Sequence, residues 1–260
     1  MALRIDQLGD LGTNIIDSGV TNNSRLGRAL DVGDINGDGI VDLVISDDDR
    51  YRQGAYDPDL TTYARNDGAV YVIFGQPGGI GEDFDVETLD GANGFRIGFN
   101  DFNFDLRVTE LATVLGDVNG DGFDDILVAR GDGQNREYAV VYGGTTFDAF
   151  VDTGSLQADE GFTAAPPINT YNYFALELNS LGDINGDGAD DFSFGEVNGG
   201  SVVLGDANGI AGVDFQDPVA ANPGSGDGFR VIAPGLGGDE NARIVAAGDV
   251  NNDGIGDFLI

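Results

Sequence analysis

The chain has 260 residues, of which 46 are acidic and 12 are basic, and its formal net charge is -34. All the basic residues are Arg, and the sequence contains no His and no Cys. A nucleic-acid partner is not expected, because neutralising phosphates requires a basic surface. Catalytic triads built on His, thiolate nucleophiles and zinc sites with nitrogen or sulfur ligands are excluded, so any site must use oxygen atoms.

The beginning of the chain, MALRIDQLGDLG, has neither the basic region nor the apolar stretch of a signal peptide. No run of the sequence approaches the roughly 18 apolar residues of a membrane-spanning helix. We therefore expect no membrane insertion by this segment. The 43 Gly residues predict a chain that turns often, as a protein of many short strands does.

A nine-residue acidic motif, D-x-N-x-D-G-x-x-D, occurs four times. A short apolar run ending in Gly precedes each copy, and a second apolar run follows it. Such runs, rich in Val, Ile, Leu, Phe and Tyr and bounded by Gly, Asp and Asn, are typical of strands. The copies are DINGDGIVD at Asp34 to Asp42, DVNGDGFDD at Asp117 to Asp125, DINGDGADD at Asp183 to Asp191 and DVNNDGIGD at Asp249 to Asp257.

After the first three motif copies, a third apolar run (AVYVIFG, EYAVVYG, GSVVLG) and a more variable fourth segment complete the repeat. Four antiparallel strands form a small sheet that cannot bury both of its faces alone, so successive sheets must stack. Radially stacked four-stranded sheets form a β-propeller. We predict an all-β fold, a single partial β-propeller over residues 1–260. Its expected parts are the end of a preceding blade at 1–26, blades at 27–97, 98–165 and 166–232, and a truncated blade at 233–260.

The acidic motif predicts a calcium site in the loop between the first and second strands of each blade. Side chains at motif positions 1, 3 and 5, the carbonyl at position 7 and both carboxylate oxygens at position 9 give six oxygen ligands, which suits Ca²⁺ better than Mg²⁺. Gly at position 6 permits the sharp turn. The predicted ligands, for up to four Ca²⁺ ions, are Asp34, Asn36, Asp38, Ile40, Asp42, Asp117, Asn119, Asp121, Phe123, Asp125, Asp183, Asn185, Asp187, Ala189, Asp191, Asp249, Asn251, Asp253, Ile255 and Asp257.

The motif has two other interpretations. An EF-hand or dockerin loop requires Glu at position 12 on a helix, whereas this position holds Ile45, Val128, Phe194 and Ile260 within apolar strand runs. Ordinary Asp, Asn and Gly turns remain the alternative, but turn chemistry alone does not require Asp at position 9 in four copies. Three carboxylates within nine residues repel one another unless a cation is bound.

The motif and the apolar runs around it resemble the FG-GAP repeats of the integrin α-subunit N-terminal β-propeller and their bacterial relatives. The Phe-Gly part of that signature is echoed by GFRIGF at Gly94 to Phe99, while the Gly-Ala-Pro part is absent. The resemblance implies a loop that binds Ca²⁺ through the residues named above. It also implies that the loops at the opposite face of the disc bind a ligand.

Tyr and Arg residues, which are frequent in interfaces, occur in two segments predicted to lie on that opposite face. The insertion after the second strand of the first repeat holds Tyr51, Arg52, Tyr56 and Tyr63, and the segment before the third repeat holds Tyr171 and Tyr173. These are candidate ligand-binding residues, and the alternative is a solvated loop extension. Glu177 lies near the second segment, but it has no evident partner for acid-base catalysis.

The sequence therefore predicts a non-enzymatic, calcium-binding propeller that acts as an extracellular or cell-surface adhesion or recognition module for a protein or a glycan. The alternative is an accessory or glycan-binding propeller of a larger secreted polysaccharide-degrading enzyme, or a lectin.

Overall fold

A computed structural model describes most of the repeats and all four copies of the motif. The residues that it describes are 14–18, 26–47, 69–81, 83–98, 111–132, 135–164, 178–196, 199–207, 228–232 and 243–260. Within these ranges the regular structure consists of β-strands and one 3₁₀ turn, with no α-helix. None of the described residues belongs to a helix of the length and apolarity that crossing a membrane requires.

The strands are short, as the brief apolar runs predict. Their bounds are β1 (Asn14–Ile16), β2 (Leu26–Gly33), β3 (Asp42–Asp47), β4 (Ala69–Ile73), β5 (Asp83–Asp85), β6 (Gly94–Gly98), β7 (Leu111–Gly116), β8 (Asp125–Asp132), β9 (Asn135–Val141), β10 (Phe150–Asp152), β11 (Gly161–Ala164), β12 (Leu178–Gly182), β13 (Asp191–Glu196), β14 (Gly199–Val203), β15 (Gly228–Ile232), β16 (Val245–Gly248) and β17 (Asp257–Leu259). The 3₁₀ turn η4 (Val86–Thr88) follows β5.

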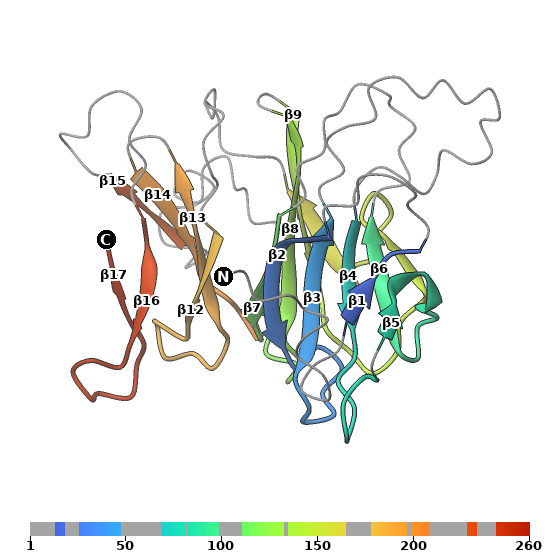
Figure 1. Cartoon of the computed structure of the whole chain (residues 1–260). Coiled ribbons are helices and arrows are strands. Elements are labelled where there is room, and N and C mark those ends of the chain that lie inside the picture. Colours follow the sequence, from blue (N-terminus) through green and yellow to red (C-terminus); the bar gives the residue numbers. More distant parts are fainter. Residues whose placement is uncertain are drawn as a thin grey trace, which may run out of the picture.

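Three antiparallel sheets of four consecutive repeat strands stand side by side (Figure 1). The first sheet contains β2, β3, β4 and β6, the second β7, β8, β9 and β11, and the third β12, β13, β14 and β15. The pair β16 and β17 repeats the arrangement of the first two strands of a sheet. This confirms the predicted all-β architecture of stacked four-stranded sheets, which is that of a partial β-propeller. The proposed bounds of the individual blades stay a prediction.

Two three-residue strands pair in parallel with strands that occur earlier in the chain. Strand β10 lies alongside β6 of the first sheet, with Val151 opposite Ile97, and β5 lies alongside β1, with Phe84 opposite Ile15. Within each repeat the four main strands are antiparallel, as predicted, whereas these two parallel pairs join a repeat to the segment before it and were not predicted. The variable segment before β11 first pairs with the preceding sheet, through β10. The sequence does not predict such a strand, because three residues are too few to show a hydrophobic period.

The first strand of a sheet usually carries a β-bulge one residue before its last Gly. The register shifts between Val114 and Gly116, between Ser180 and Gly182, and between Ala246 and Gly248. The extra residue in the first two of these strands, Leu115 or Leu181, is at most 2% exposed. Strand β2 has its irregularity elsewhere, between Leu26 and Leu30, so its last residues alternate faces without a bulge.

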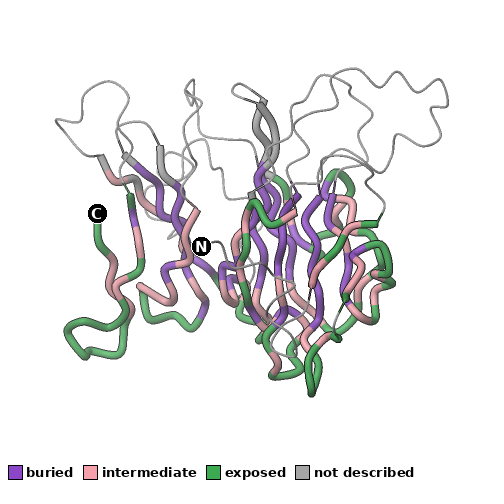
Figure 2. Tube along the Cα trace, in the orientation of Figure 1, coloured by how far each residue is buried: buried purple, intermediate pink, exposed green. Residues whose placement is uncertain are grey.

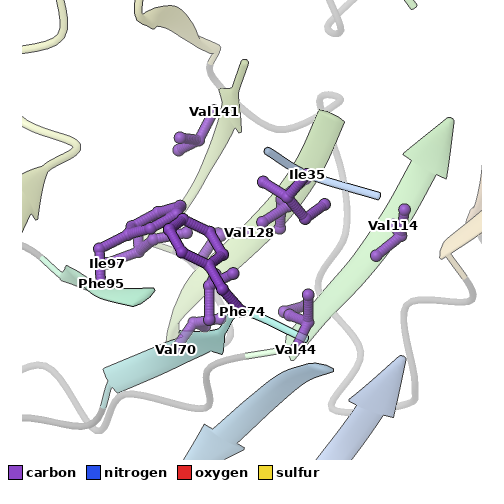
Figure 3. Close-up of a cluster of buried hydrophobic side chains, with 12 residues drawn as sticks. Ile35, Val44, Val70, Phe74, Phe95, Ile97, Val114, Val128 and Val141 are labelled. Atoms are coloured by element: carbon purple, nitrogen blue, oxygen red, sulfur yellow. The ribbon is translucent and has the colours of Figure 1, made fainter. Parts of the chain in front are cut away.

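Apolar side chains form the core between neighbouring sheets. One cluster joins residues of the first sheet, such as Val44, Val70 and Phe95, to Val114 and Val128 of the second (Figure 3). The Phe95 ring stacks on Phe147, with centroids 4.1 Å apart and planes 9° apart. A second cluster joins the second sheet to Phe192, Phe194 and Val203 of the third. The sheets therefore stabilise one another through their faces, as blades do.

Candidate metal centre

The four acidic motifs form loops between the first two strands of each sheet. Loop 1 (residues 34–41) joins β2 to β3, loop 2 (117–124) joins β7 to β8, loop 3 (183–190) joins β12 to β13, and loop 4 (249–256) joins β16 to β17. In Figure 1 the turns that follow β2, β12 and β16 lie at the same, lower end of the sheets. Position 9 of each motif is the first residue of the second strand.

Each loop is closed by backbone N–H groups that donate to its own carboxylates. In loop 1 the N–H of Gly39 donates to Asp34 Oδ2 at 2.9 Å, and the N–H of Ile40 donates to Asp38 Oδ1 at 2.8 Å. The equivalent bonds in loops 2, 3 and 4 measure 2.8–3.0 Å. Gly39 has φ +82°, a left-handed conformation that favours Gly. Gly at position 6 therefore permits the turn, as predicted.

Asn at position 3 is tied to Asp at position 5 in the first three loops. In loop 2 the Asn119 side-chain oxygen accepts from the Asp121 N–H at 3.0 Å, and the Asn119 amide donates to Asp121 Oδ2 at 2.9 Å. Loops 1 and 3 contain the same two bonds. The side chains at positions 1, 3 and 5 are thus held within one short loop, although each keeps oxygen lone pairs that the backbone does not use.

Asp at position 9 has a structural role that the sequence did not reveal. Asp42, Asp125 and Asp191 are fully buried. In Asp125, Oδ2 accepts from the Val118 N–H at 2.9 Å and Oδ1 accepts from the Gly143 N–H at 2.9 Å. Asp42 and Asp191 make the same pair of contacts, with Gly75 and Gly205 as the glycine donors. The carboxylate therefore fastens its loop to the chain just after the third strand.

Burial makes these carboxylates difficult to ionise. Desolvation raises the pKa of Asp125 to about 8 and that of Asp191 to about 7, while the backbone N–H donors act in the opposite direction. The pKa of Asp42 is also raised, mainly by desolvation. In each case a neighbouring carboxylate of the same loop adds to the increase. None of the four motifs contains a basic residue, so the loop itself supplies no side chain that could compensate the charge.

The loops offer oxygen atoms to a cation, but their carboxylates alone do not surround one. Asp34 Oδ1 is buried and has no hydrogen-bond partner, and such an oxygen is suited to ligate an ion. Within the described ranges, however, no three acidic side chains gather into a group that could hold a metal by themselves. In loop 1 Asp42 Oδ2 already accepts two N–H groups, so ligation there needs the amide and carbonyl oxygens as well. The assignment of the twenty predicted ligands stays a prediction.

Neighbouring loops are joined by hydrogen bonds at motif position 8. Asp124 of loop 2 accepts from the Asp34 N–H at 2.7 Å through Oδ2, and its own N–H donates to the Asp34 carbonyl at 3.2 Å. Asp190 of loop 3 makes the same two bonds to Asp117, at 3.0 and 2.7 Å. Gly256 of loop 4 makes only the backbone bond, to the Asp183 carbonyl. The loops therefore form a continuous row along one end of the sheets.

Replacing Asp124 by Ala should lower the free energy of unfolding by about 1–3 kcal/mol, because the part-buried Asp34 N–H loses its acceptor. Urea unfolding in chelator measures this loss without any contribution from a cation. Asp159→Ala is the control, because it removes the same charge from an exposed turn. Equal midpoints for the two variants would contradict a role for the bridge between loops 1 and 2.

The predicted ligand-binding residues Tyr51, Arg52, Tyr56, Tyr63, Tyr171 and Tyr173 lie outside the described residues. The sequence interpretation also overlooked two kinds of residue that the structure places at the loops. One is the Asp at motif position 8, which could have been noticed because it occurs in two copies of the motif, as Asp124 and Asp190. The other is the Gly after the third strand, at positions 75, 143 and 205, which recurs after an apolar run in each complete repeat.

Comparison with known proteins agrees with the repeat architecture. Residues 111–142 match the family model of the FG-GAP repeat. This stretch contains β7, loop 2, β8 and β9, so the match covers one acidic loop and the three strands around it. No curated protein matches the chain. The resemblance to FG-GAP repeats is thus confirmed, and the chain carries an FG-GAP repeat within a partial β-propeller.

Proposed function

We propose that this chain is a calcium-binding, integrin-like propeller module that serves extracellular adhesion or recognition and has no catalytic role. The observation that carries the proposal is the common geometry of the four loops. In each of them the carboxylates at positions 1 and 5 are fixed by the N–H groups at positions 6 and 7. Loops with this geometry present carboxylate, amide and carbonyl oxygens, which are the ligands that Ca²⁺ prefers.

A bound cation would supply positive charge where the chain has a surplus of negative charge. The buried position-9 carboxylates have raised pKa values, and the net charge is -34. Both features oppose a compact state without counterions. Because every loop is linked to its neighbour, an ion held in one loop would also favour the junction between two sheets. The ion's role is therefore structural in this proposal.

The family match and the expected affinity support the proposed location and role. Extracellular calcium modules bind with Kd of about 10⁻⁴–10⁻³ M, which suits secreted proteins. The FG-GAP match at 111–142 supports an integrin-like propeller. Strand β3 begins directly after loop 1 and ends at Asp47, so its last residue lies at the end of the first sheet away from the loops. We propose that side as the ligand-binding one.

Thermal unfolding in calcium and in chelator tests the proposal. An ion concentration ten to a hundred times Kd should stabilise the fold by about 1.4–2.7 kcal/mol per occupied loop, or roughly 3–11 °C in Tm at about 2–4 °C per kcal/mol. Equilibrium dialysis should count up to four ions. Asp187→Ala removes an exposed carboxylate from loop 3 and should reduce this count by one.

Two controls make the calcium experiment specific. Asp159→Ala lowers the charge equally at an exposed turn outside the loops, and it should leave the number of bound ions unchanged. Mg²⁺ at the same concentration controls for general screening of the acidic chain. The same Tm in Ca²⁺, Mg²⁺ and chelator would exclude the proposed metal centre.

A further inference from the structure

The Asp at motif position 8 contacts the backbone of position 1 in the preceding loop. At the first junction, Asp124 Oδ2 accepts from the Asp34 N–H at 2.7 Å, and the Asp124 N–H donates to the Asp34 carbonyl at 3.2 Å. At the second junction, Asp190 makes the same two bonds to Asp117. Asp34 and Asp117 are the first predicted ligands of loops 1 and 2. The backbone of each is therefore held on both sides of its Cα by a residue that is not itself a predicted ligand.

The glycine before loop 1 and the glycine before loop 2 leave room for this contact. A Cβ atom at Gly33 would lie 2.7 Å from Asp124 Oδ2, and a Cβ atom at Gly116 would lie 2.8 Å from Asp190 Cγ. Both distances are shorter than van der Waals contact allows, so each carboxylate packs directly against the turn that leads into the preceding loop. At Gly182, which leads into loop 3, an added Cβ atom would meet no atom within 4 Å.

Loop 3 lacks this support from the loop that follows it. Position 8 of loop 4 is Gly256, which has no side chain and makes only the backbone bond to the Asp183 carbonyl, at 2.9 Å. Positions 4 to 6 are exposed in loops 1, 2 and 3 alike, as Figure 2 shows for the turn after β12. The three loops are therefore equally open to an ion and differ in how their first ligand is held.

The position-1 carboxylates of the three loops also differ in how many N–H groups they accept. Asp34 Oδ1 is buried and has no hydrogen-bond partner. Asp117 Oδ1 accepts one backbone N–H of its own loop, and Asp183 Oδ1 accepts two. An oxygen that already accepts N–H groups has fewer lone pairs left for an ion. The position-1 oxygen is therefore most available in loop 1 and least available in loop 3.

We propose that Asp124 and Asp190 are positioning residues for the calcium sites of loops 1 and 2, and that loop 3 binds Ca²⁺ more weakly than either. This inference rests on the proposed calcium-binding function. A neighbour that orients a metal ligand is typically worth about 10–100-fold in metal affinity. Because the contact here is to the ligand's backbone and not to its carboxylate oxygens, we expect an effect at the lower end of that range, about tenfold.

A calcium titration of the isotope-labelled chain, followed by NMR, measures the loops one at a time. The N–H at motif position 6 donates to the position-1 carboxylate, so the amide signals of Gly39, Gly122 and Gly188 report on loops 1, 2 and 3. The midpoint of each signal is the calcium concentration at which half of its shift has occurred. In the wild-type chain the midpoints of Gly39 and Gly122 should be about tenfold lower than the midpoint of Gly188.

Two reciprocal variants test the positioning residues. Asp124→Ala should move the Gly39 midpoint to about tenfold higher calcium and leave the Gly188 midpoint unchanged. Asp190→Ala should move the Gly122 midpoint by a similar factor and leave the Gly39 midpoint unchanged. The dispersion of the amide signals of each variant in chelator shows that it is folded, so that lost folding is not mistaken for lost affinity.

A conservative variant separates positioning from charge. Asp124→Asn keeps an acceptor oxygen for the Asp34 N–H but removes the charge, so it should recover most of the lost affinity of loop 1. Asp159→Ala removes a charge from an exposed turn and should change no midpoint. Equal wild-type midpoints for Gly39 and Gly188, or an Asp124→Asn variant as weak as Asp124→Ala, would overturn the inference and leave calcium binding supported. If calcium shifted none of these signals, both the inference and the proposed function would be overturned.

Discussion

Replacing Gly143 by Ala should lower the free energy of unfolding by about 3 kcal/mol or more, at the upper end of the range for overpacking. A Cβ atom at this position would lie 2.6 Å from the Asp124 carbonyl oxygen, 2.6 Å from Phe123 Cβ and 2.8 Å from the Ile35 carbonyl oxygen. Two of these contacts are backbone atoms that cannot rotate away, and Ile35 belongs to loop 1 of the preceding sheet. The added methyl group would therefore displace loop 2 and separate the first sheet from the second at their junction.

The expected decrease in Tm for Gly143→Ala is about 6–12 °C, at roughly 2–4 °C per kcal/mol for a chain of this size. Gly144→Ala is the matched control, since a Cβ there meets no atom within 4 Å. Because that change only restricts the unfolded chain, we expect it to be neutral or to stabilise by about 0.4–1 kcal/mol. Thermal unfolding of both variants in chelator compares them directly. Similar Tm values for the two would show that the junction yields easily to an added methyl group.

Replacing Asp125 by Ala should cost about 2–4 kcal/mol of unfolding free energy in the absence of metal. The substitution leaves the N–H groups of Val118 and Gly143 without their acceptors, and each unsatisfied buried donor costs about 1–3 kcal/mol. Part of this loss is offset because the variant no longer buries a carboxyl group whose ionisation is disfavoured, as its pKa of about 8 indicates. Asn is no substitute, because its NH₂ group would face one of the two donors.

The fourth motif provides an internal comparison for Asp125→Ala. Asp257 occupies the same position, but only its Oδ2 accepts N–H groups, from Val250 and Asn251 in an exposed loop. Water can satisfy these donors, so Asp257→Ala should cost clearly less than Asp125→Ala. Urea unfolding at neutral pH in chelator, with Asp159→Ala as the charge control, measures both. An equal cost for Asp125→Ala and Asp159→Ala would mean that the buried carboxylate does not fasten the loop.

The parts of the structure that sequence predicts well are those specified by local chemistry. The apolar run before Asp117 and the run after Asp125 become β7 and β8, because a short run of β-branched and large apolar residues between turn residues favours a strand. Gly122 has φ +93°, as the motif requires of position 6. The stacking of the sheets was also predictable, because a small sheet must bury both of its faces. This prediction depends on the repetition of the sequence and not on any single residue.

The features that the sequence interpretation missed are contacts between distant segments. Asp124 and Asp34 meet through two hydrogen bonds across a sheet junction, and nothing near either residue specifies that meeting. Gly143 is required because the carbonyls of Ile35 and Asp124 approach it, which depends on how two sheets are placed. The sequence predicted Asp125 only as a calcium ligand. A motif shows that a carboxylate is present, but it does not show which backbone N–H groups that carboxylate contacts.

The parallel pairing of β10 with β6 has a consequence for how such a chain could grow in evolution. The segment after β9 contributes a strand to the sheet before its own, and β5 likewise pairs with β1. A gene duplication that copies one whole period gives each new unit both a donated strand and a strand to receive the next donation. One period of the sequence, such as the stretch from β7 to β11, therefore includes a strand that belongs to the neighbouring sheet. Each added period would be joined to the one before it by backbone hydrogen bonds as well as by apolar packing.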